Sequence, residues 1–103
     1  MRYYEFMFIL RTDLEQEKKS EILGKIAEVL GRNGFSIVKE NHMGVQKLAY
    51  EIQKMSNGEY YLYYLKTEDH KGIQEVRNYL NMVQDILRYI FIKKEKLDAE
   101  MEA

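Results

Sequence analysis

Alternating hydrophobic and polar positions open the chain and predict a β-strand over residues 2–11. One face is uniformly large and apolar, and we assign it to the core: Tyr4, Phe6, Phe8 and Leu10. The opposite face is also too apolar to lie fully in water: Tyr3, Glu5, Met7 and Ile9. A strand that is apolar on both faces is usually central in its sheet, so we expect a central position for this one.

After this strand, the apolar residues recur at helical spacing up to about residue 32. They are Ile22, Leu23, Ile26, Ala27, Val29 and Leu30. Thr12 and Glu15 have the spacing of a capping box at the start of a helix, and Gly31 or Gly34 is expected to end it. The charged face should carry two i,i+4 ion pairs, Glu21 with Lys25 and Glu28 with Arg32.

A β-hairpin is predicted in the middle of the chain. Gly44–Gln53 alternates at period two, and Glu59–Lys66 is rich in tyrosine, which favours strands. The intervening segment Lys54–Gly58 ends in Asn-Gly, a turn signal because both residues tolerate positive φ. Residues 35–40 are β-forming and run on into the first hairpin strand, where Gly44 indicates a bulge or bend.

The rest of the chain predicts one more helix and one more strand. Ile73, Val76, Tyr79 and Leu80 indicate an amphipathic helix of about three turns. Residues 86–92 indicate the last strand, with one set of side chains on the core face: Leu87, Tyr89 and Phe91. Arg88, Ile90 and Ile92 take its other face.

The predicted order is βαββαβ. Short connections and right-handed crossovers favour an α+β, ferredoxin-like sandwich, with a four-stranded antiparallel sheet and two helices on one face. The first strand and the tyrosine-rich strand would be central, and the Gly44–Gln53 strand and the last strand would be edges. The other face of the sheet would be open.

Composition narrows the class of protein. A chain of 103 residues with 46% hydrophobic residues fits one globular domain, which we place at residues 1–96, followed by an acidic, flexible tail at 97–103. There is no cysteine, no secretory signal and no apolar run long enough to span a bilayer, so a cytoplasmic protein is expected. Residues 1–96 carry all 16 basic residues, whereas Asp98, Glu100 and Glu102 fall in the tail. A weakly basic body of this kind can touch nucleic acid but would not capture it unaided.

No constellation of catalytic residues is visible. His42 and His70 are the chain's 2 histidines and lack metal-ligand spacing, and there is no glycine-rich phosphate loop. We therefore expect no enzyme, cofactor, metal or small-molecule substrate. The alternative hypothesis from the enzyme class is a ferredoxin-like oxygenase or ligand sensor. In such a protein the open sheet faces of two chains would pair and enclose a cavity in the dimer.

Two surfaces are candidates for binding. The open face would gather an apolar patch, which a protein partner, neighbouring side chains or the tail would cover: Tyr3, Met7, Ile9, Tyr60, Leu62, Tyr64, Ile90 and Ile92. Aromatic residues on such a face also suggest an independent single-stranded RNA-binding module like the RNA-recognition motif, with Tyr60 and Tyr64 as stacking platforms. The charged edge strand suits a specific polar interface.

The segment 44–54, GVQKLAYEIQK, closely resembles the signature of the bacterial small-subunit ribosomal protein six family. The opening MRYYE, the glycine-tyrosine strand and the ending RYIFIK at 88–93 are similar to the same family, so the resemblance extends to Lys96. It implies a ferredoxin-like fold and a structural, non-enzymatic role in the cytoplasmic ribosome. It also implies binding of the central domain of 16S ribosomal RNA as a heterodimer with small-subunit ribosomal protein eighteen.

The resemblance also implies site residues. Lys47 matches a basic edge position, and with Gln46, Glu40 and Asn41 it is expected to contact the protein partner. Glu51 stands where many family members have proline, which leaves an edge N–H free to pair. Expected phosphate contacts lie near the ends of the first and last strands: Arg2, Arg88, Lys93 and Lys94.

Overall fold

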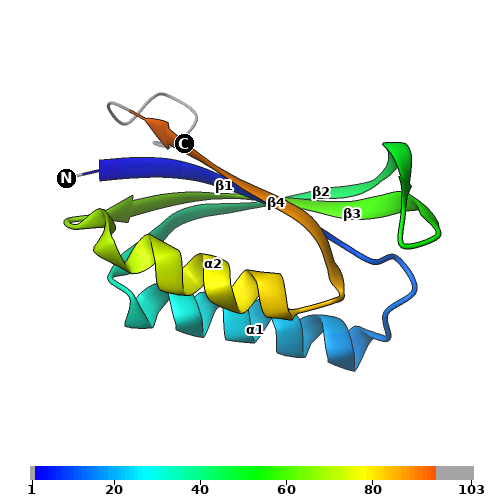
Figure 1. Cartoon of the computed structure of the whole chain (residues 1–103), viewed down its shortest axis with the longest axis horizontal. Coiled ribbons are helices and arrows are strands. Elements are labelled where there is room, and N and C mark those ends of the chain that lie inside the picture. Colours follow the sequence, from blue (N-terminus) through cyan, green and yellow to red (C-terminus); the bar gives the residue numbers. More distant parts are fainter. Residues whose placement is uncertain (1, 95–103) are drawn as a thin grey trace.

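The structure, a computed structural model, describes residues 2–94, and these residues form the predicted βαββαβ order. The strands are β1 (Arg2–Leu10), β2 (Phe35–Ile52), β3 (Met55–Thr67) and β4 (Ile86–Lys94), and the helices are α1 (Gln16–Arg32) and α2 (Ile73–Met82), the latter preceded by a 3₁₀ turn (His70–Gly72). The strands pair antiparallel in the order β2-β3-β1-β4 (Figure 1). The ferredoxin-like fold and the central positions of β1 and β3 are therefore confirmed.

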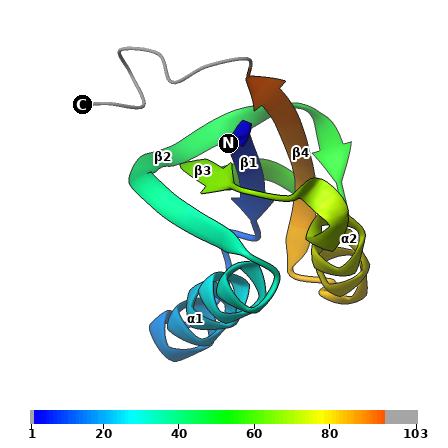
Figure 2. The ribbon, with the colours of Figure 1, turned by 90° about the vertical axis from the view of Figure 1, so that its left-hand side faces the viewer.

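Both helices lie on the same side of the sheet, and the other side is open (Figure 2). The main core fills the space between these layers. Phe6, Phe8 and Leu10 of β1 are fully buried there, and β3 contributes Tyr61, Tyr63 and Leu65. Burying residues of this size contributes roughly 1.5–3 kcal/mol each, which explains why the alternation in β1 predicts its core face correctly.

A smaller core forms on the open side, beneath the turn end of β2. Ile9, Leu48, Ile52 and Leu87 bury one another there, with Met55 and Tyr60 packed against them. Leu87 was expected on the helix face, and this expectation is wrong. Ile9 pairs with Arg88 but Leu10 pairs with Ile86, so a bulge turns Leu87 to the opposite side.

The hairpin turn is also not where Asn-Gly predicted it. Ile52 pairs with Met55, so the turn consists of Gln53 and Lys54, with φ of 49° and 65°. Asn57 and Gly58 lie inside β3, opposite Lys47 and Gln46. The physical reason is burial: a register shift between Lys47 and Ile52 lets Leu48 and Ile52 reach the smaller core, and Gly58 leaves room for Leu48 to approach β3 closely. The bulge predicted at Gly44 is confirmed, with a φ of 82° and a register shift beside it.

The start of α1 differs from the predicted capping box. The helix begins at Gln16 behind an extended Glu15, and no side chain caps it. Thr12 instead lies in the turn after β1, where Arg11 binds Asp13 at 2.9 Å. At the other end the helix stops at Arg32, and Gly34 adopts a φ of 84°, as a terminating glycine should.

Of the two ion pairs expected on α1, Glu28–Arg32 is present at 3.7 Å. Lys25 lies 3.7 Å from Glu28 and not beside Glu21. The boundary predicted at residue 96 and the acidic tail at 97–103 lie outside the described residues.

Candidate functional site

The edge strand β2 presents the polar residues predicted to contact a protein partner. Glu40 and Asn41 precede the bulge at Gly44, opposite Tyr63 and Leu62 of β3. Gln46 and Lys47 follow the bulge; both are exposed, and the amide of Gln46 donates a hydrogen bond to the Met43 carbonyl at 3.2 Å. The four predicted residues therefore share one strand at the border of the sheet, in two pairs separated by a bend.

Large apolar side chains are also exposed on β2. Val45 is 61% exposed and Tyr50 is 63% exposed, and Val38 and Met43 are also exposed. Sequence reasoning assigned no role to these residues. An edge with unpaired backbone groups, mixed charges and exposed apolar side chains can pair with or pack against another protein.

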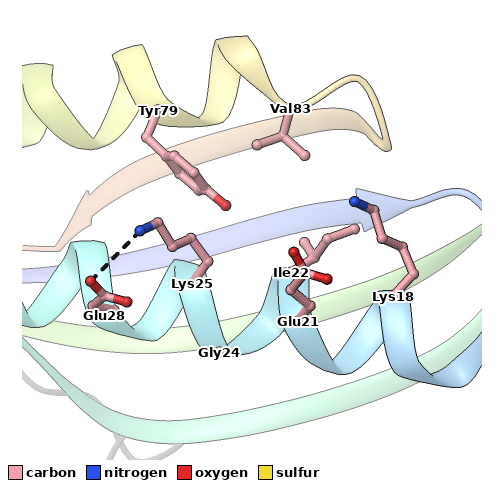
Figure 3. A pocket seen from close by; sticks show the side chains of 8 residues that line it. All are labelled: Lys18, Glu21, Ile22, Gly24, Lys25, Glu28, Tyr79 and Val83. Carbon is pink, nitrogen blue, oxygen red and sulfur yellow. Dashed lines mark ion pairs between the residues drawn. The ribbon is translucent and has the colours of Figure 1, made fainter.

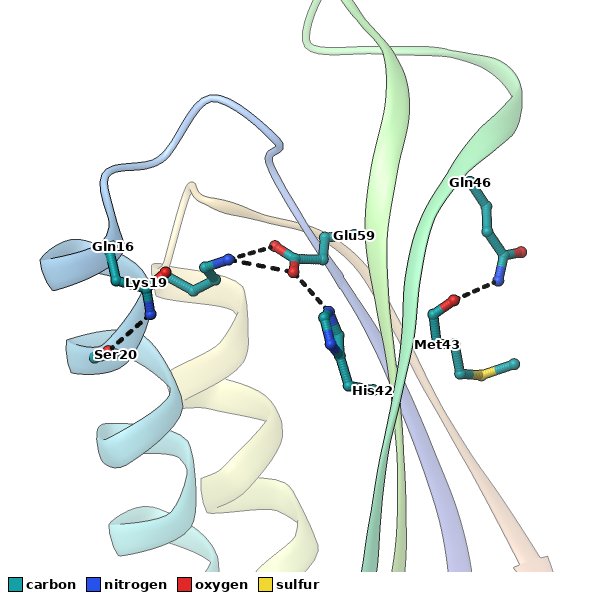
Figure 4. A network of polar contacts seen from close by, with 7 residues as sticks. All are labelled: Gln16, Lys19, Ser20, His42, Met43, Gln46 and Glu59. Atoms are coloured by element: carbon teal, nitrogen blue, oxygen red, sulfur yellow. Dashed lines mark hydrogen bonds and ion pairs between the residues drawn. The ribbon is translucent and has the colours of Figure 1, made fainter.

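A buried carboxylate ties this edge to the helix layer (Figure 4). Glu59 of β3 is 6% exposed and accepts hydrogen bonds from Lys19 of α1 and from the imidazole Nε2 of His42, the latter at 2.6 Å. The ring of His42 also stacks on Tyr61, with centroids 4.8 Å apart. His42, for which the sequence indicated no metal-binding role, is largely exposed and forms one end of this network.

The network sets the protonation state of Glu59. Burial alone would raise its pKa, but hydrogen bonds from His42 and Lys19 outweigh that effect, so the pKa of Glu59 is lowered. Conversely, burial and the neighbouring carboxylate raise the pKa of Tyr61 to about 12. Glu59 is thus held as an anion, paired with Lys19 and hydrogen-bonded to His42, an arrangement that fixes the position of β2 relative to α1.

The basic residues predicted to contact phosphate separate into two places. Arg2, Lys93 and Lys94 gather at one end of the sheet, since Tyr3 pairs with Lys94 and Tyr4 pairs with Lys93. Arg2 donates a hydrogen bond to the Glu68 carbonyl at 3.2 Å, and Lys94 lies 3.4 Å from Glu5. Arg88 pairs with Ile9 at the other end of β4, so the structure does not bring it together with the other three.

The open face is less exposed than the sequence suggested. Tyr64 is 4% exposed and Ile9 is buried in the smaller core, whereas Ile90 remains 51% exposed and Ile92 is also exposed. Tyr64 therefore offers no free ring face for a base, which removes one of the two predicted stacking platforms. Tyr60 is half-buried against the smaller core.

The largest of the described hollows is a groove of about 510 Å³ between α1 and α2 (Figure 3). Its lining residues are Lys18, Glu21, Ile22, Gly24, Lys25, Glu28, Tyr79 and Val83. Burial, Glu21 and Glu28 raise the pKa of Tyr79, and Lys25 is paired with Glu28. The charged groups all lie on α1, across the groove from Tyr79 and Val83, and they do not pair a nucleophile with a base.

Two further features concern residues 2–94 alone. No cluster of three or more histidine, cysteine, aspartate or glutamate side chains there could hold a metal ion. No helix in the same range is long and apolar enough to cross a membrane.

Comparison with known proteins identifies the family. The family "Ribosomal protein S6" matches residues 3–93. Proteins named "Small ribosomal subunit protein bS6" are similar over 95 residues, or 92% of this chain: 38% identical in Nitratiruptor sp., covering 73% of that protein, and 37% in Campylobacter lari, covering 76%.

Solved structures agree with this family. The crystal structure of 30S ribosomal protein S6 from Thermotoga maritima superposes with a TM-score of 0.84 at 28% identity, over 90% of this chain and 87% of that one. The C-terminal domain of the MgtC protein from Mycobacterium tuberculosis shares the fold alone, with a TM-score of 0.57 at 12% identity over 96% of this chain and 94% of that domain. The chain therefore belongs to the ribosomal protein S6 family, and is a structural, non-enzymatic protein of the small subunit of the cytoplasmic ribosome, as its sequence predicted.

Proposed function

We propose that this chain binds the central domain of 16S ribosomal RNA as one half of a heterodimer with small-subunit ribosomal protein eighteen. The observation that carries the proposal is the edge of β2. This strand is the outermost of the sheet, and it carries Glu40, Asn41, Gln46 and Lys47. The exposed Val45 and Tyr50 add apolar area beside them. A strand edge that combines charged, polar and apolar side chains supports a specific protein contact better than it supports direct RNA binding.

The charge of the chain also supports a protein contact at β2 over direct RNA binding by the chain alone. The chain has a formal net charge of −1, so it lacks the strong positive field of an independent RNA-binding protein. Arg2, Lys93 and Lys94 form a local basic end on β1 and β4, and Arg88 offers a separate contact. These residues would position the chain on the RNA, while a basic partner would supply much of the phosphate affinity.

The protein contact is tested by charge reversal on the edge. Lys47→Glu should weaken the complex with ribosomal protein eighteen, measured by titration calorimetry, without lowering the melting temperature, because Lys47 is exposed. Lys18→Glu is the matched control, since Lys18 is an exposed lysine on α1, away from the edge. Equal affinities for the wild type and both variants would refute the assignment of β2 as the interface.

The RNA contact is tested by the salt dependence of binding to a central-domain RNA fragment. The chain alone should bind weakly, and the heterodimer should bind tightly, with an affinity that falls steeply as salt increases. Equally tight binding by the chain without its partner would contradict the proposal.

A further inference from the structure

Tyr3 lies between two lysines on the open side of the sheet. In the strand register Tyr3 pairs with Lys66 of β3 on one side and with Lys94 of β4 on the other. Tyr4, the next residue, is buried in the main core, so Tyr3 and its two neighbours face away from the helices. Adjacent strands are about 4.8 Å apart, so the two lysines flank a half-buried aromatic ring at close range.

The charges around this row favour an anion. Lys66 is exposed on the open side, whereas Arg2 and Lys93 lie at the same end of the sheet but on its helix side, in phase with Tyr4. Glu5, the acidic residue in the next row of the open side, is 3.4 Å from Lys94, so these two charges offset each other and Lys66 is the remaining cation of the row. The row therefore presents an aromatic ring between one exposed lysine, Lys66, and a second lysine, Lys94, that is paired with Glu5.

Other tyrosines on this face are less suitable for stacking. Tyr64 is buried, and Tyr60 packs against the smaller core. An aromatic ring flanked by cations is the arrangement with which proteins hold single-stranded nucleic acid, because the ring stacks on a base and the cations contact the neighbouring phosphates. A protein partner has no comparable need for two lysines around one ring, and β2 already provides an edge for it.

We infer that Tyr3 stacks on an unpaired base of the bound RNA, with Lys66 and Lys94 contacting the phosphates on either side. This inference rests on the proposed RNA-binding function and adds to it a stacking residue and a lysine, Lys66, that the sequence did not single out. At this end of the sheet, the chain would therefore contact a single-stranded nucleotide, and not only the backbone of an RNA duplex.

The first test uses fluorescence. The chain has no tryptophan, so Tyr3→Trp introduces one reporter that retains the ability to stack. Titration with an oligouridylate of about eight nucleotides at low salt should quench this tryptophan in a saturable manner. Tyr50→Trp is the matched control, because Tyr50 is 63% exposed and also has lysines nearby in the sequence, Lys47 and Lys54. Equal quenching of both tryptophans, or none at Tyr3→Trp, would overturn the inference.

The second test uses the heterodimer with ribosomal protein eighteen and the central-domain RNA fragment. Tyr3→Leu should weaken binding about 5- to 150-fold, the usual effect of losing one stacked base, and leave the salt dependence unchanged. Lys66→Ala should lower the slope of log affinity against log salt by about 0.7. Both variants should retain the wild-type melting temperature, which separates a binding role from a folding role.

The two tests distinguish the inference from the function on which it rests. If the wild-type heterodimer binds the RNA tightly and Tyr3→Leu binds equally well, the stacking role is wrong and the proposed function stands. If the wild-type heterodimer does not bind the RNA, the proposed function is wrong, and the oligouridylate titration alone decides whether Tyr3 can stack on a base.

Discussion

Gly58 allows the turn end of the hairpin to close over the open side of the sheet, and replacing it should destabilise the fold. A Cβ at this position would overlap the Cγ2 of Ile9 and lie 3.2 Å from the Cδ2 of Leu48 and 3.7 Å from the Cδ1 of Leu87. Ile9 and Leu48 are buried, and the methyl of a β-branched residue in a packed core has little freedom to move aside. Gly58→Ala therefore adds a methyl group where no space exists.

The expected cost follows from this overlap. Overpacking a core costs about 1–3 kcal/mol, whereas replacing glycine by alanine inside a strand would otherwise stabilise by about 0.5–1 kcal/mol. The packing effect should exceed the backbone effect, so the net change should be a loss of roughly 1–2 kcal/mol. For a domain of this size each 1 kcal/mol corresponds to about 4–8 °C in melting temperature.

The assay is thermal and urea unfolding followed by circular dichroism. Gly24→Ala is the matched control, because a Cβ at Gly24, on the exposed face of α1, meets nothing within 4 Å. This control should stabilise by about 0.5–1 kcal/mol. Ile9→Leu removes the Cγ2 methyl, so the cost of Gly58→Ala should be smaller in that background. A melting temperature for Gly58→Ala at or above that of the wild type would refute the packing argument.

Three further outcomes are expected. Lys54→Gly should stabilise the hairpin by up to about 1 kcal/mol in urea unfolding, because Lys54 has a φ of 65°, a region that costs non-glycine residues about 1–2 kcal/mol. The control is Ser56→Gly in the adjoining strand, which should destabilise the fold. Despite the opposing effect of burial, hydrogen bonds from His42 and Lys19 lower the pKa of Glu59, so its charge stabilises the fold above the unfolded pKa of about 4.3 and that contribution is lost as pH falls through the folded value. Glu59→Gln should thus show a weaker loss of stability on acidification, and an unchanged acid-unfolding curve would contradict this. Burial and Glu59 raise the pKa of Tyr61 to about 12, so Tyr61→Phe should remove absorbance change near pH 12 and leave the main phenolate transition unaltered.

The fold could be predicted because the period of the apolar residues is unambiguous in the two central strands. Phe6 and Phe8 on one face, and Tyr61 and Leu65 in β3, bury enough area that no other register would compensate for exposing them. Once two central strands are known, the βαββαβ order leaves few topologies.

The errors in the prediction come from positions where a local preference conflicts with burial elsewhere. Asn57-Gly58 is a favourable turn sequence, yet the chain turns at Gln53-Lys54 with positive φ because Leu48 and Ile52 are then buried. The side chain of Gln53 accepts a hydrogen bond from Arg11 and donates one to the Gln84 carbonyl, and both bonds help to stabilise this turn. Neither contact is local in sequence, so periodicity and turn propensity could not reveal them.

The candidate site was only partly predictable for a similar reason. The resemblance located the β2 edge, but the network around Glu59 went unnoticed because a glutamate at the start of a strand is usually solvated. One signal was available: Glu59 alternates in phase with Tyr61 and Tyr63, which belong to the main core. An acid in phase with core residues should be expected to have a cationic partner, and Lys19 is that partner.

Lys47, at the turn end of the β2 edge, lies far from the proposed stacking row at Tyr3 along the same central strand, and this separation has a testable consequence. Lys47 pairs with Asn57 near one end of β3, and Tyr3 pairs with Lys66 near the other. Nine residues of strand correspond to about 30 Å, so a protein bound around Lys47 need not cover the base-stacking row. Lys47→Glu should therefore weaken heterodimer formation without altering quenching at Tyr3→Trp, while Lys66→Ala should do the reverse. If either substitution disturbed both measurements equally, the two surfaces would have to overlap, and the separate roles assigned to the edge and to the basic end would be wrong.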